Sequence, residues 1–314
     1  MIPALVLTAG LATRLRPLSF VRAKAALPVA GEPLVRRILR GLRGAGVTDA
    51  VLNLHWLPHT LTSRIGDGGD LGMRVRYSWE TPVLGSAGGP KRALPILGAP
   101  TFLIVNGDTL TDVDLAAVVA AHQASGALVT MAVVPNHEPD KYGGVIVERD
   151  GAVTGFVRRG AAQPSYHFIG VQVTETRAWE RVPANVPYES VGALYPEIIA
   201  ARRGAVRAHV SAAAFMDIGT PSDYLETALL LGERDGTGNP PGARSRIHPT
   251  ARIERSILWD DVEVGEGSLL RECIVTDGAV VPEDTSWIGV SLRRADGDLA
   301  PHERRIGDLA IASL

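Results

Sequence analysis

A loop near the N-terminus combines small residues with two cations, a pattern that suits a phosphate chain. The apolar run Ala4-Leu5-Val6-Leu7 leads into Thr8-Ala9-Gly10-Leu11-Ala12-Thr13-Arg14, and Lys24 follows shortly afterwards. Small side chains let backbone N–H groups approach phosphate oxygens closely. Arg14 would add a planar fork of donors and Lys24 a compact charge. No Gly-Lys-Ser/Thr follows, so this is not a Walker loop, and taken alone it could be an ordinary turn.

Four segments follow one another in an order that is typical of one enzyme family. The first runs from Leu7 to Leu18, with Lys24 and Pro28-Val29 beyond it. The others are Leu84-Gly85-Ser86-Ala87-Gly88, Asn106-Gly107-Asp108 and the segment from Asp217 to Tyr224. Together they resemble the signature of the sugar-1-phosphate nucleotidylyltransferases over residues 1 to about 232. The resemblance implies an enzyme that joins a nucleoside triphosphate to a sugar 1-phosphate and releases pyrophosphate.

The same resemblance implies roles for individual residues. Asp108 and Asp217 match two carboxylates that hold Mg²⁺ between the reacting phosphates, an ion that prefers oxygen ligands. Arg14 would then neutralise the departing pyrophosphate and Lys24 the phosphates near the reacting centre, which makes Arg14, Lys24, Asp108 and Asp217 the expected catalytic residues. The residues expected to bind the nucleotide are Leu7, Ala9, Gly10, Leu11, Ala12, Thr13, Arg14, Gly85, Gly88, which would lie against the base, and Asn106.

The sugar-binding segments depart from the family pattern. Tyr142-Gly143 matches a segment whose backbone lines the sugar, but Arg158-Arg159-Gly160 stands where the family has Glu-Lys-Pro. Arg159 keeps the cation and the acid is missing. Phe168-Ile169-Gly170 replaces an Asn-x-Gly segment, and Ala12 replaces the second Gly of the first loop. Glu189 either supplies the missing carboxylate or is a solvated loop acid. The residues expected to bind the sugar are therefore Tyr142, Gly143, Arg159, Gly170 and Glu189.

Short apolar runs alternate with helical patterns in the part of the chain that must position these residues. Residues 4–7, 50–54, 103–105 and 129–134 are predicted to be buried strands, and Leu34, Ile38 and Leu42 predict a helix. Residues 144–148 and 151–156 predict a hairpin. Alternating strands and helices favour an α/β fold with helices on both faces of a mostly parallel sheet, which the family resemblance implies is Rossmann-like. We expect this catalytic domain to span residues 1–235.

The pattern changes after a Gly- and Pro-rich linker at residues 236–242. Ile247, Ile253, Leu258, Val264, Leu270, Val275 and Val281 recur at spacings of 6, 5, 6, 6, 5 and 6. This period predicts a short left-handed hexapeptide β-helix over residues 243–290, with about two coils before Pro282 and a tail at 291–314. A pair of hairpins is the alternative. We expect the tail to pack against a neighbouring subunit or the catalytic domain, giving a homo-oligomer.

Two substrate pairs stay open. Residues 84–88 and the short β-helix favour GTP with mannose 1-phosphate. His55 and Trp56 resemble a His-x-Trp-Leu segment of the N-acetylmuramate phosphate uridylyltransferases, which makes UTP with N-acetylmuramate or another amino-sugar 1-phosphate the alternative. A non-catalytic nucleotide-sugar-binding regulatory subunit would explain the altered sugar segments, but would not need both Asp108 and Asp217. Acyl transfer by the repeat domain is disfavoured because the repeat is short.

Composition excludes several classes of function. The 32 basic and 34 acidic side chains almost cancel, which argues against binding to nucleic acid through overall charge. Cys273 is the only cysteine in the sequence, so neither an internal disulfide nor a thiolate zinc site is possible, and we expect it to be a buried core thiol. The sequence has neither an apolar run of membrane-spanning length nor a basic signal-peptide start, so we predict no membrane association and a cytoplasmic location.

Overall fold

The computed structural model describes residues 2–314, which form two compact units. The first unit contains residues 2–10, 37–58 and 65–216, and the second contains residues 11–36, 59–64 and 217–314. Helices α1 (Leu34–Gly44) and α2 (Pro58–Ile65) contribute residues to both. Each unit therefore combines segments that are far apart in the sequence.

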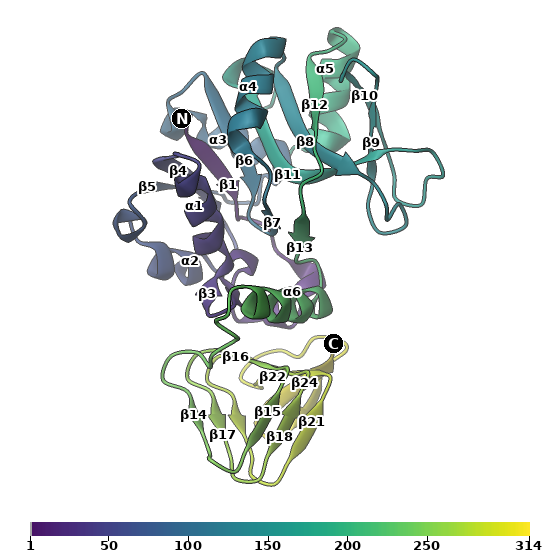
Figure 1. Ribbon diagram of the computed structural model, residues 1–314. Helices are drawn as coiled ribbons and strands as arrows, with labels where there is room; N and C mark the ends of the chain where they lie inside the picture. Colours follow the sequence, from purple (N-terminus) through teal and green to yellow (C-terminus); the bar gives the residue numbers. More distant parts are fainter. Residues whose placement is uncertain (1) are drawn as a thin grey trace. The chain divides into compact units, whose positions relative to one another are not determined.

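The first unit is built on one large mixed sheet (Figure 1). Its strands are β1 (Ala4–Leu7), β4 (Asp49–Leu54), β5 (Arg74–Trp79), β6 (Thr101–Asn106), β8 (Val129–Pro135), β9 (Gly144–Val147), β10 (Val153–Val157), β11 (Tyr166–Glu175) and β12 (Val206–Val210). β5, β4, β1 and β6 are parallel neighbours, and so are β8 and β12. β11 runs antiparallel between β6 and β8. The expected α/β fold is confirmed, with β11 and the β9–β10 hairpin as antiparallel insertions.

Both faces of this sheet are buried, as a parallel sheet requires. Leu5, Val51 and Ile104 point into one core, together with residues of α3 (Gly85–Leu97) and α5 (Tyr195–Ala201). Their strand neighbours Ala4 and Val6 are also fully buried and face the opposite side, because side chains alternate along a strand. The remaining regular elements of this unit are η4 (Gly69–Leu71), β7 (Thr109–Thr111), α4 (Leu115–Ser125), η5 (Thr176–Trp179) and the π-helical η6 (Ser190–Leu194).

The second unit begins with the residues that follow the first loop. They form the 3-10 turns η1 (Thr13–Leu15), η2 (Leu18–Phe20) and η3 (Lys24–Ala26), then the strands β2 (Pro28–Val29) and β3 (Glu32–Pro33). α6 (Pro221–Arg234) lies against β2. Strand β13 (Phe215–Asp217) leads into α6 from the first unit.

The C-terminal part of the second unit is a β-helix, as the repeat predicted. Its successive coils within the described residues are formed by β14 (Arg246–Ile247), β15 (Arg252–Glu254) and β16 (Ile257–Leu258), then β17 (Glu263–Val264), β18 (Leu269–Arg271) and β19 (Ile274–Val275), then β20 (Val280–Val281), β21 (Ser286–Ile288) and β22 (Val290–Arg294). Equivalent residues lie 17 positions apart. The expected inward residues form one core, from Ile247 through Val281.

The residues after Pro282 complete a further coil beyond the two that the spacing predicted. β22 then pairs with β24 (Leu309–Ser313), which pairs with β23 (Arg304–Ile306), both antiparallel. This hairpin extends the sheet of β16, β19 and β22 and adds Leu309 and Ile311 to the core. Cys273 is fully buried, as expected, and burial raises the pKa of its thiol. Among the described residues, no helix has the length and hydropathy needed to cross a membrane.

Candidate active site

The first loop is shaped by Ala12, whose backbone is left-handed, and by a hydrogen bond from Thr8 to Asn53 of β4. Ala12 has a φ of 49°, in the region that favours glycine, and it precedes η1. This conformation gives a physical reason for the glycine that the family pattern places there. The Ala12 carbonyl accepts hydrogen bonds from the Leu15 N–H (3.0 Å) and the Ser19 hydroxyl (2.9 Å), which hold the turn closed.

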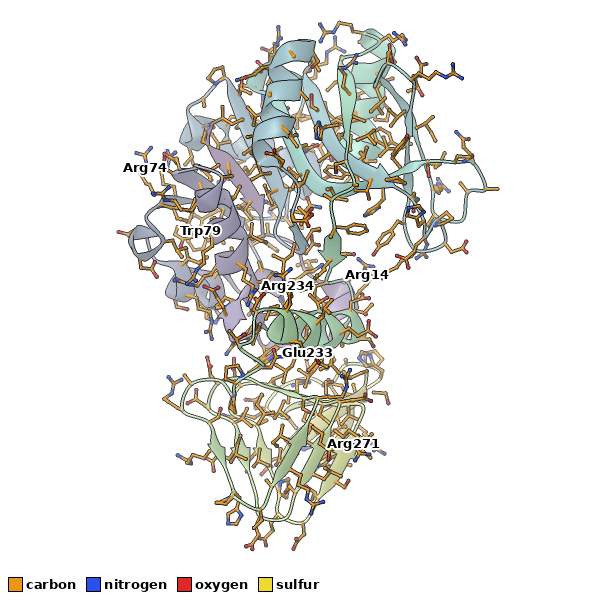
Figure 2. The ribbon with its side chains drawn as sticks, viewed as in Figure 1. Arg14, Arg74, Trp79, Glu233, Arg234 and Arg271 are labelled. Carbon is orange, nitrogen blue, oxygen red and sulfur yellow. The ribbon has the colours of Figure 1, made fainter. Side chains whose placement is uncertain are left out.

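Arg14 is exposed on η1 (Figure 2). A Cβ added to Gly219 would lie 3.3 Å from Arg14 Nη1, so this guanidinium lies beside the segment that begins with Asp217. Lys24 is half-buried at the start of η3. The second unit therefore brings Arg14 together with the segment from Asp217 to Tyr224.

Asp217 is not the residue that caps α6. Thr220 occupies the N-cap, its hydroxyl accepts from the Asp223 N–H (3.1 Å), and Asp223 accepts from the Thr220 N–H (2.9 Å). This capping box satisfies the start of the helix without Asp217, which ends β13 and is half-buried. The acid that helps to cap α6 is therefore Asp223 and not Asp217.

Asn106, Gly107 and Asp108 follow one another at the end of β6, in the first unit. Asn106 pairs in register with Leu7, and the Gly107 N–H donates to the Leu7 carbonyl (3.0 Å). A Cβ on Gly107 would lie 2.5 Å from that oxygen, so only glycine fits there. Gly170 also packs against Asn106, 3.0 Å from its Cβ when a Cβ is built on the glycine. Asp108 is half-buried at this carboxyl-terminal edge, where α/β sheets place their ligands.

Gly85, Gly88 and Glu189 meet at the N-terminus of α3. The Tyr188 carbonyl accepts from the N–H groups of Ala87 (2.8 Å) and Gly88 (3.2 Å). Glu189 is exposed, and its Oε2 accepts from the Ser86 hydroxyl (2.6 Å). Gly88 is buried under the loop, because a Cβ there would lie 2.6 Å from the Val186 carbonyl. The loop at residues 186–190 therefore shapes the start of α3, and Glu189 belongs to it.

Glu80 and Asn53 connect the first loop to α3, and sequence reasoning missed both roles. Glu80, which directly follows β5, is 2% exposed although its neighbour Trp79, the last residue of that strand, is 54% exposed (Figure 2). Its carboxylate accepts from Asn53 Nδ2 and from the Leu84 N–H, both at 2.7 Å. Asn53 Oδ1 accepts from the Thr8 N–H (2.7 Å). The available signal was an acid at the end of a strand, four residues before Leu84.

His55, which suggested the second substrate pair, lies at the same edge. It is half-buried, and its Nδ1 is 3.0 Å from the Glu80 carbonyl. Trp56 is half-buried as well, so neither residue belongs fully to the core.

Tyr142 borders a pocket of about 430 Å³ in the first unit. Its lining includes Tyr142, His167 and Phe215. The Tyr142 and His167 rings are 4.1 Å apart, and the His167 and Phe215 rings 4.7 Å. Arg159 is exposed, and a Cβ on Gly143 would lie 3.9 Å from its backbone nitrogen. The pocket therefore has an aromatic wall.

His167 is a third residue that sequence reasoning missed, although it lies directly before the expected Phe168-Ile169-Gly170 segment. Burial lowers the pKa of its imidazole to about 4, although a hydrogen bond with the Gly143 backbone and the charge of Glu138 oppose this. The ring is thus neutral near pH 7. Its Nδ1 atom is buried and makes no hydrogen bond within residues 2–314.

The expected site residues are distributed over both units. Leu7, Ala9, Gly10, Gly85, Gly88, Asn106, Asp108 and the sugar-binding set belong to the first, whereas Leu11, Ala12, Thr13, Arg14, Lys24 and Asp217 belong to the second. Within residues 2–314, no group of three or more His, Cys, Asp or Glu side chains could hold a metal by itself.

Two family models match consecutive parts of the chain. The nucleotidyl transferase family model matches residues 3–234, and a GlmU-like, C-terminal hexapeptide model matches residues 242–299. A mannose-1-phosphate guanylyltransferase of Mycobacterium tuberculosis is 28% identical over 297 residues, covering 86% of this chain and 83% of that protein. An N-acetylmuramate alpha-1-phosphate uridylyltransferase of Neisseria meningitidis serogroup B is 33% identical over 237 residues, covering 73% and 98%.

Solved structures are similar at the level of the fold. The crystal structure of HddC from Yersinia pseudotuberculosis matches with a TM-score of 0.65 and 23% identity, covering 74% of this chain and all of that one.

Proposed function

Because the chain belongs to the nucleotidyl transferase family, we propose that it joins GTP to mannose 1-phosphate, releasing pyrophosphate and forming GDP-mannose. The length of the match to the Mycobacterium tuberculosis guanylyltransferase carries this proposal. It covers 86% of the chain, more than residues 3–234 contain, so it includes part of the β-helix as well. A relative that aligns with both the nucleotidyl transferase region and the β-helix is the better guide to the substrates of a chain that contains both.

Uridylyl transfer to N-acetylmuramate 1-phosphate is the second candidate. The Neisseria uridylyltransferase has the higher identity, 33% against 28%, but matches 73% of this chain while almost all of that protein is covered. His55 and Trp56 favour this candidate. The two candidates differ in both base and sugar, so one assay separates them.

The proposed reaction is an in-line displacement at phosphorus. An oxygen of the sugar 1-phosphate forms a bond to the α-phosphorus as the bond to the bridging oxygen of the leaving pyrophosphate breaks. Both reactants are anions, so the protein has to position them and neutralise their charge. We assign Arg14 to the departing pyrophosphate and Lys24 to phosphate near the reacting centre. The loop from Leu7 to Thr13, with Gly85, Gly88 and Asn106, would hold the rest of the nucleotide.

Asp108 and Asp217 have the donor chemistry that Mg²⁺ needs. Both are half-buried carboxylates at strand ends, and Mg²⁺ is usually held by one or two carboxylates together with substrate phosphates and water. The absence of a larger acidic cluster among residues 2–314 is compatible with such a site. When bound, the ion would neutralise charge that develops between the two phosphates.

The pocket beside Tyr142 supports a sugar site in the first unit. Its aromatic rings offer apolar faces to a sugar ring, and burial keeps the His167 ring neutral near pH 7. Gly143, Gly170, Arg159 and Glu189 complete the proposed set. Glu189 is the only one of these whose carboxylate could replace the missing acid of the family pattern, and its contact with Ser86 places it at the start of α3.

The test is pyrophosphate release with Mg²⁺, measured for GTP, UTP, ATP, CTP and dTTP against mannose, glucose, N-acetylglucosamine and N-acetylmuramic acid 1-phosphates. Turnover with GTP and mannose 1-phosphate alone supports the proposal, and turnover with UTP and the muramate alone supports the second candidate. Nucleotide binding without turnover in any combination would indicate a regulatory subunit instead.

We also propose that the protein is a homo-oligomer that associates through its β-helix. Val280 and Ile288, on edge strands of the last coil, are 53% and 56% exposed. Light scattering of the full chain and of Val280→Lys with Ile288→Lys tests this. A monomeric mass for the unaltered chain would contradict it.

A further inference from the structure

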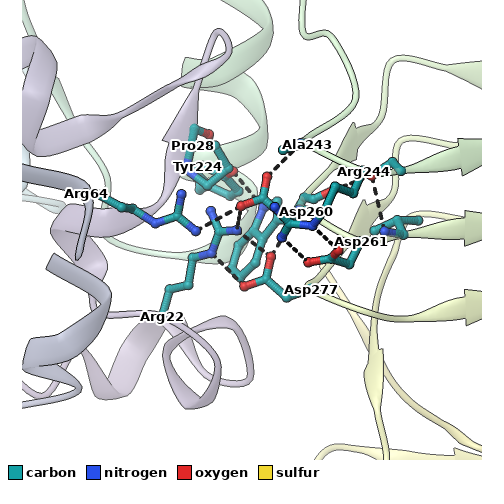
Figure 3. A network of polar contacts seen from close by, with 12 residues as sticks. Arg22, Pro28, Arg64, Tyr224, Ala243, Arg244, Asp260, Asp261 and Asp277 are labelled. Carbon is teal, nitrogen blue, oxygen red and sulfur yellow. Dashed lines mark hydrogen bonds and ion pairs between the residues drawn. The ribbon is translucent and has the colours of Figure 1, made fainter.

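Arg22 is a buried cation that lies two residues before Lys24 and contacts the β-helix. It is 1% exposed. Its Nε donates to Asp277 Oδ2 (2.7 Å), and its Nη2 donates to Asp277 Oδ1 and to Asp260 Oδ2 (2.8 Å) (Figure 3). The guanidinium also lies over the Trp259 ring, 4.9 Å from its centroid. All of these residues belong to the second unit.

The same turn of the β-helix holds the other end of the segment that carries Lys24. The Tyr224 hydroxyl donates to the Pro28 carbonyl (2.6 Å) and accepts from Trp259 Nε1 (3.0 Å). Both rings are fully buried. Residues 22–28 are therefore tied to the β-helix at Arg22, directly, and at Pro28, through α6.

The coil period explains why two acids meet one arginine. Asp260 and Asp277 are 17 residues apart, which places them at equivalent positions of successive coils, and the Asp260 N–H donates to Asp277 Oδ1 (3.1 Å). Arg64, from α2, donates to Asp260 Oδ2 as well (2.9 Å). Two carboxylates thus face two guanidinium groups, so the charges of the network balance.

Nothing in the chemistry of the first loop requires this network, since Arg22 is enclosed and cannot reach a ligand. A buried arginine with bidentate geometry fixes the backbone that bears it more strongly than an exposed pair would. A displacement of about 1 Å in a group that contacts a reacting phosphate can cost about 100-fold in rate. The position of residues 22–28 is therefore important for Lys24.

We propose that Asp277 and Asp260 are positioning residues, through which the β-helix holds Arg22 and thereby places Lys24 for phosphate binding. The inference rests on the proposed function, because it gives Lys24 its task. It assigns the C-terminal domain a part in nucleotidyl transfer that the catalytic motifs do not contain.

A double-mutant cycle tests the coupling. Asp277→Asn keeps the size of the side chain and removes its charge, and we expect kcat to fall about 10- to 100-fold. In a Lys24→Met background, the same substitution should cost less than about twofold, because its effect passes through Lys24. Asp261→Asn is the matched control, since Asp261 lies in the same turn but pairs with the exposed Arg244. If the fold loss in kcat of the double variant equals the product of the losses of the two single variants, the proposal is wrong.

Hydrogen exchange gives a readout that does not need turnover. Amides of residues 18–28 should exchange faster in Asp277→Asn than in the unaltered protein, and should be unchanged in Asp261→Asn. An unaltered protein that is inactive with every substrate pair would refute the proposed function, and faster exchange would then still support the anchor. Unchanged exchange in Asp277→Asn would refute the anchor whether or not the protein is active.

Discussion

Arg22 and Asp277 form a two-point ion pair across 255 residues of sequence. One comes from the turns that follow the first loop and the other from the β-helix. Arg22 is enclosed, whereas the Asp277 side chain keeps 30% of its exposure, so the pair lies at the margin of the buried network. The charge of Arg22 and the hydrogen bond from Arg64 hold the pKa of Asp260 below its usual value, even though burial, the largest influence, acts to raise it.

Asp108→Asn and Asp217→Asn should each reduce turnover by at least about 100-fold, because amides bind Mg²⁺ far less well than carboxylates. The free energy of unfolding should change by less than about 1 kcal/mol, since neither residue caps a helix or lies fully buried. Pyrophosphate release and urea denaturation measure the two effects. Glu233→Gln, on the exposed face of α6, is the control. Full activity in either Asp variant, or after chelation of divalent metal, would contradict the metal assignment.

Glu80→Gln should destabilise the protein by about 1–3 kcal/mol. The carboxylate accepts from Asn53 and Leu84, and an amide can accept at only one of its two terminal atoms, so one buried donor would face another. Chemical denaturation measures the loss, and the exposed Glu180→Gln should stay within about 0.5 kcal/mol. Equal stabilities for the two variants would show that Glu80 does not hold this edge together.

Gly88→Ala should cost about 1–3 kcal/mol of stability, because the added methyl group would overlap the Val186 carbonyl and Leu84 Cβ. Gly41→Ala provides the matched comparison. Gly41 is an exposed residue within α1 whose added Cβ would meet no atom within 4 Å, so that variant should gain about 0.5–1 kcal/mol. Thermal unfolding of both variants decides the matter. If Gly88→Ala leaves the stability unchanged, residues 186–188 move aside easily.

Acidification should weaken the fold between pH 6.5 and about 4. The pKa of His167 is about 4 in the folded protein and near 6.5 in the unfolded chain, so the unfolded chain binds more protons in that window. Stability is therefore complete above pH 6.5 and is lost as the pH falls, by at most about 1.4 kcal/mol per pH unit for one proton. Urea denaturation at several pH values in this range gives the free energy of unfolding as a function of pH. We expect this free energy to fall less steeply with decreasing pH in His167→Gln than in the unaltered protein. If the free energy of unfolding depends on pH equally in both proteins, other groups are responsible for the acid sensitivity.

Local sequence patterns predicted strands and helices of the first unit and the β-helix repeat of the second. Buried strands such as 50–54 were visible as apolar runs, and the inward positions of the β-helix as residues spaced by five or six, because burial on a regular backbone leaves a period in the sequence. Asp108 was selected through its motif, Asn106-Gly107-Asp108, which begins at the last residue of β6, and its role stays a prediction. His167 was not selected, because burial lowers its pKa and the rings beside it, Tyr142 and Phe215, come from distant parts of the sequence.

The sequence by itself determined the family, the α/β and β-helix architectures, and the residue types that could hold a triphosphate, because each is written in contiguous motifs or short periods. Only the tertiary structure decided that Glu80 joins the first loop to α3 and that Asp260 and Asp277 enclose Arg22. A buried charge is satisfied by whichever partners the fold brings within about 3 Å. The side-chain partners, Asn53 for Glu80 and Asp260 and Asp277 for Arg22, lie 27 to 255 residues away, and no local pattern records them.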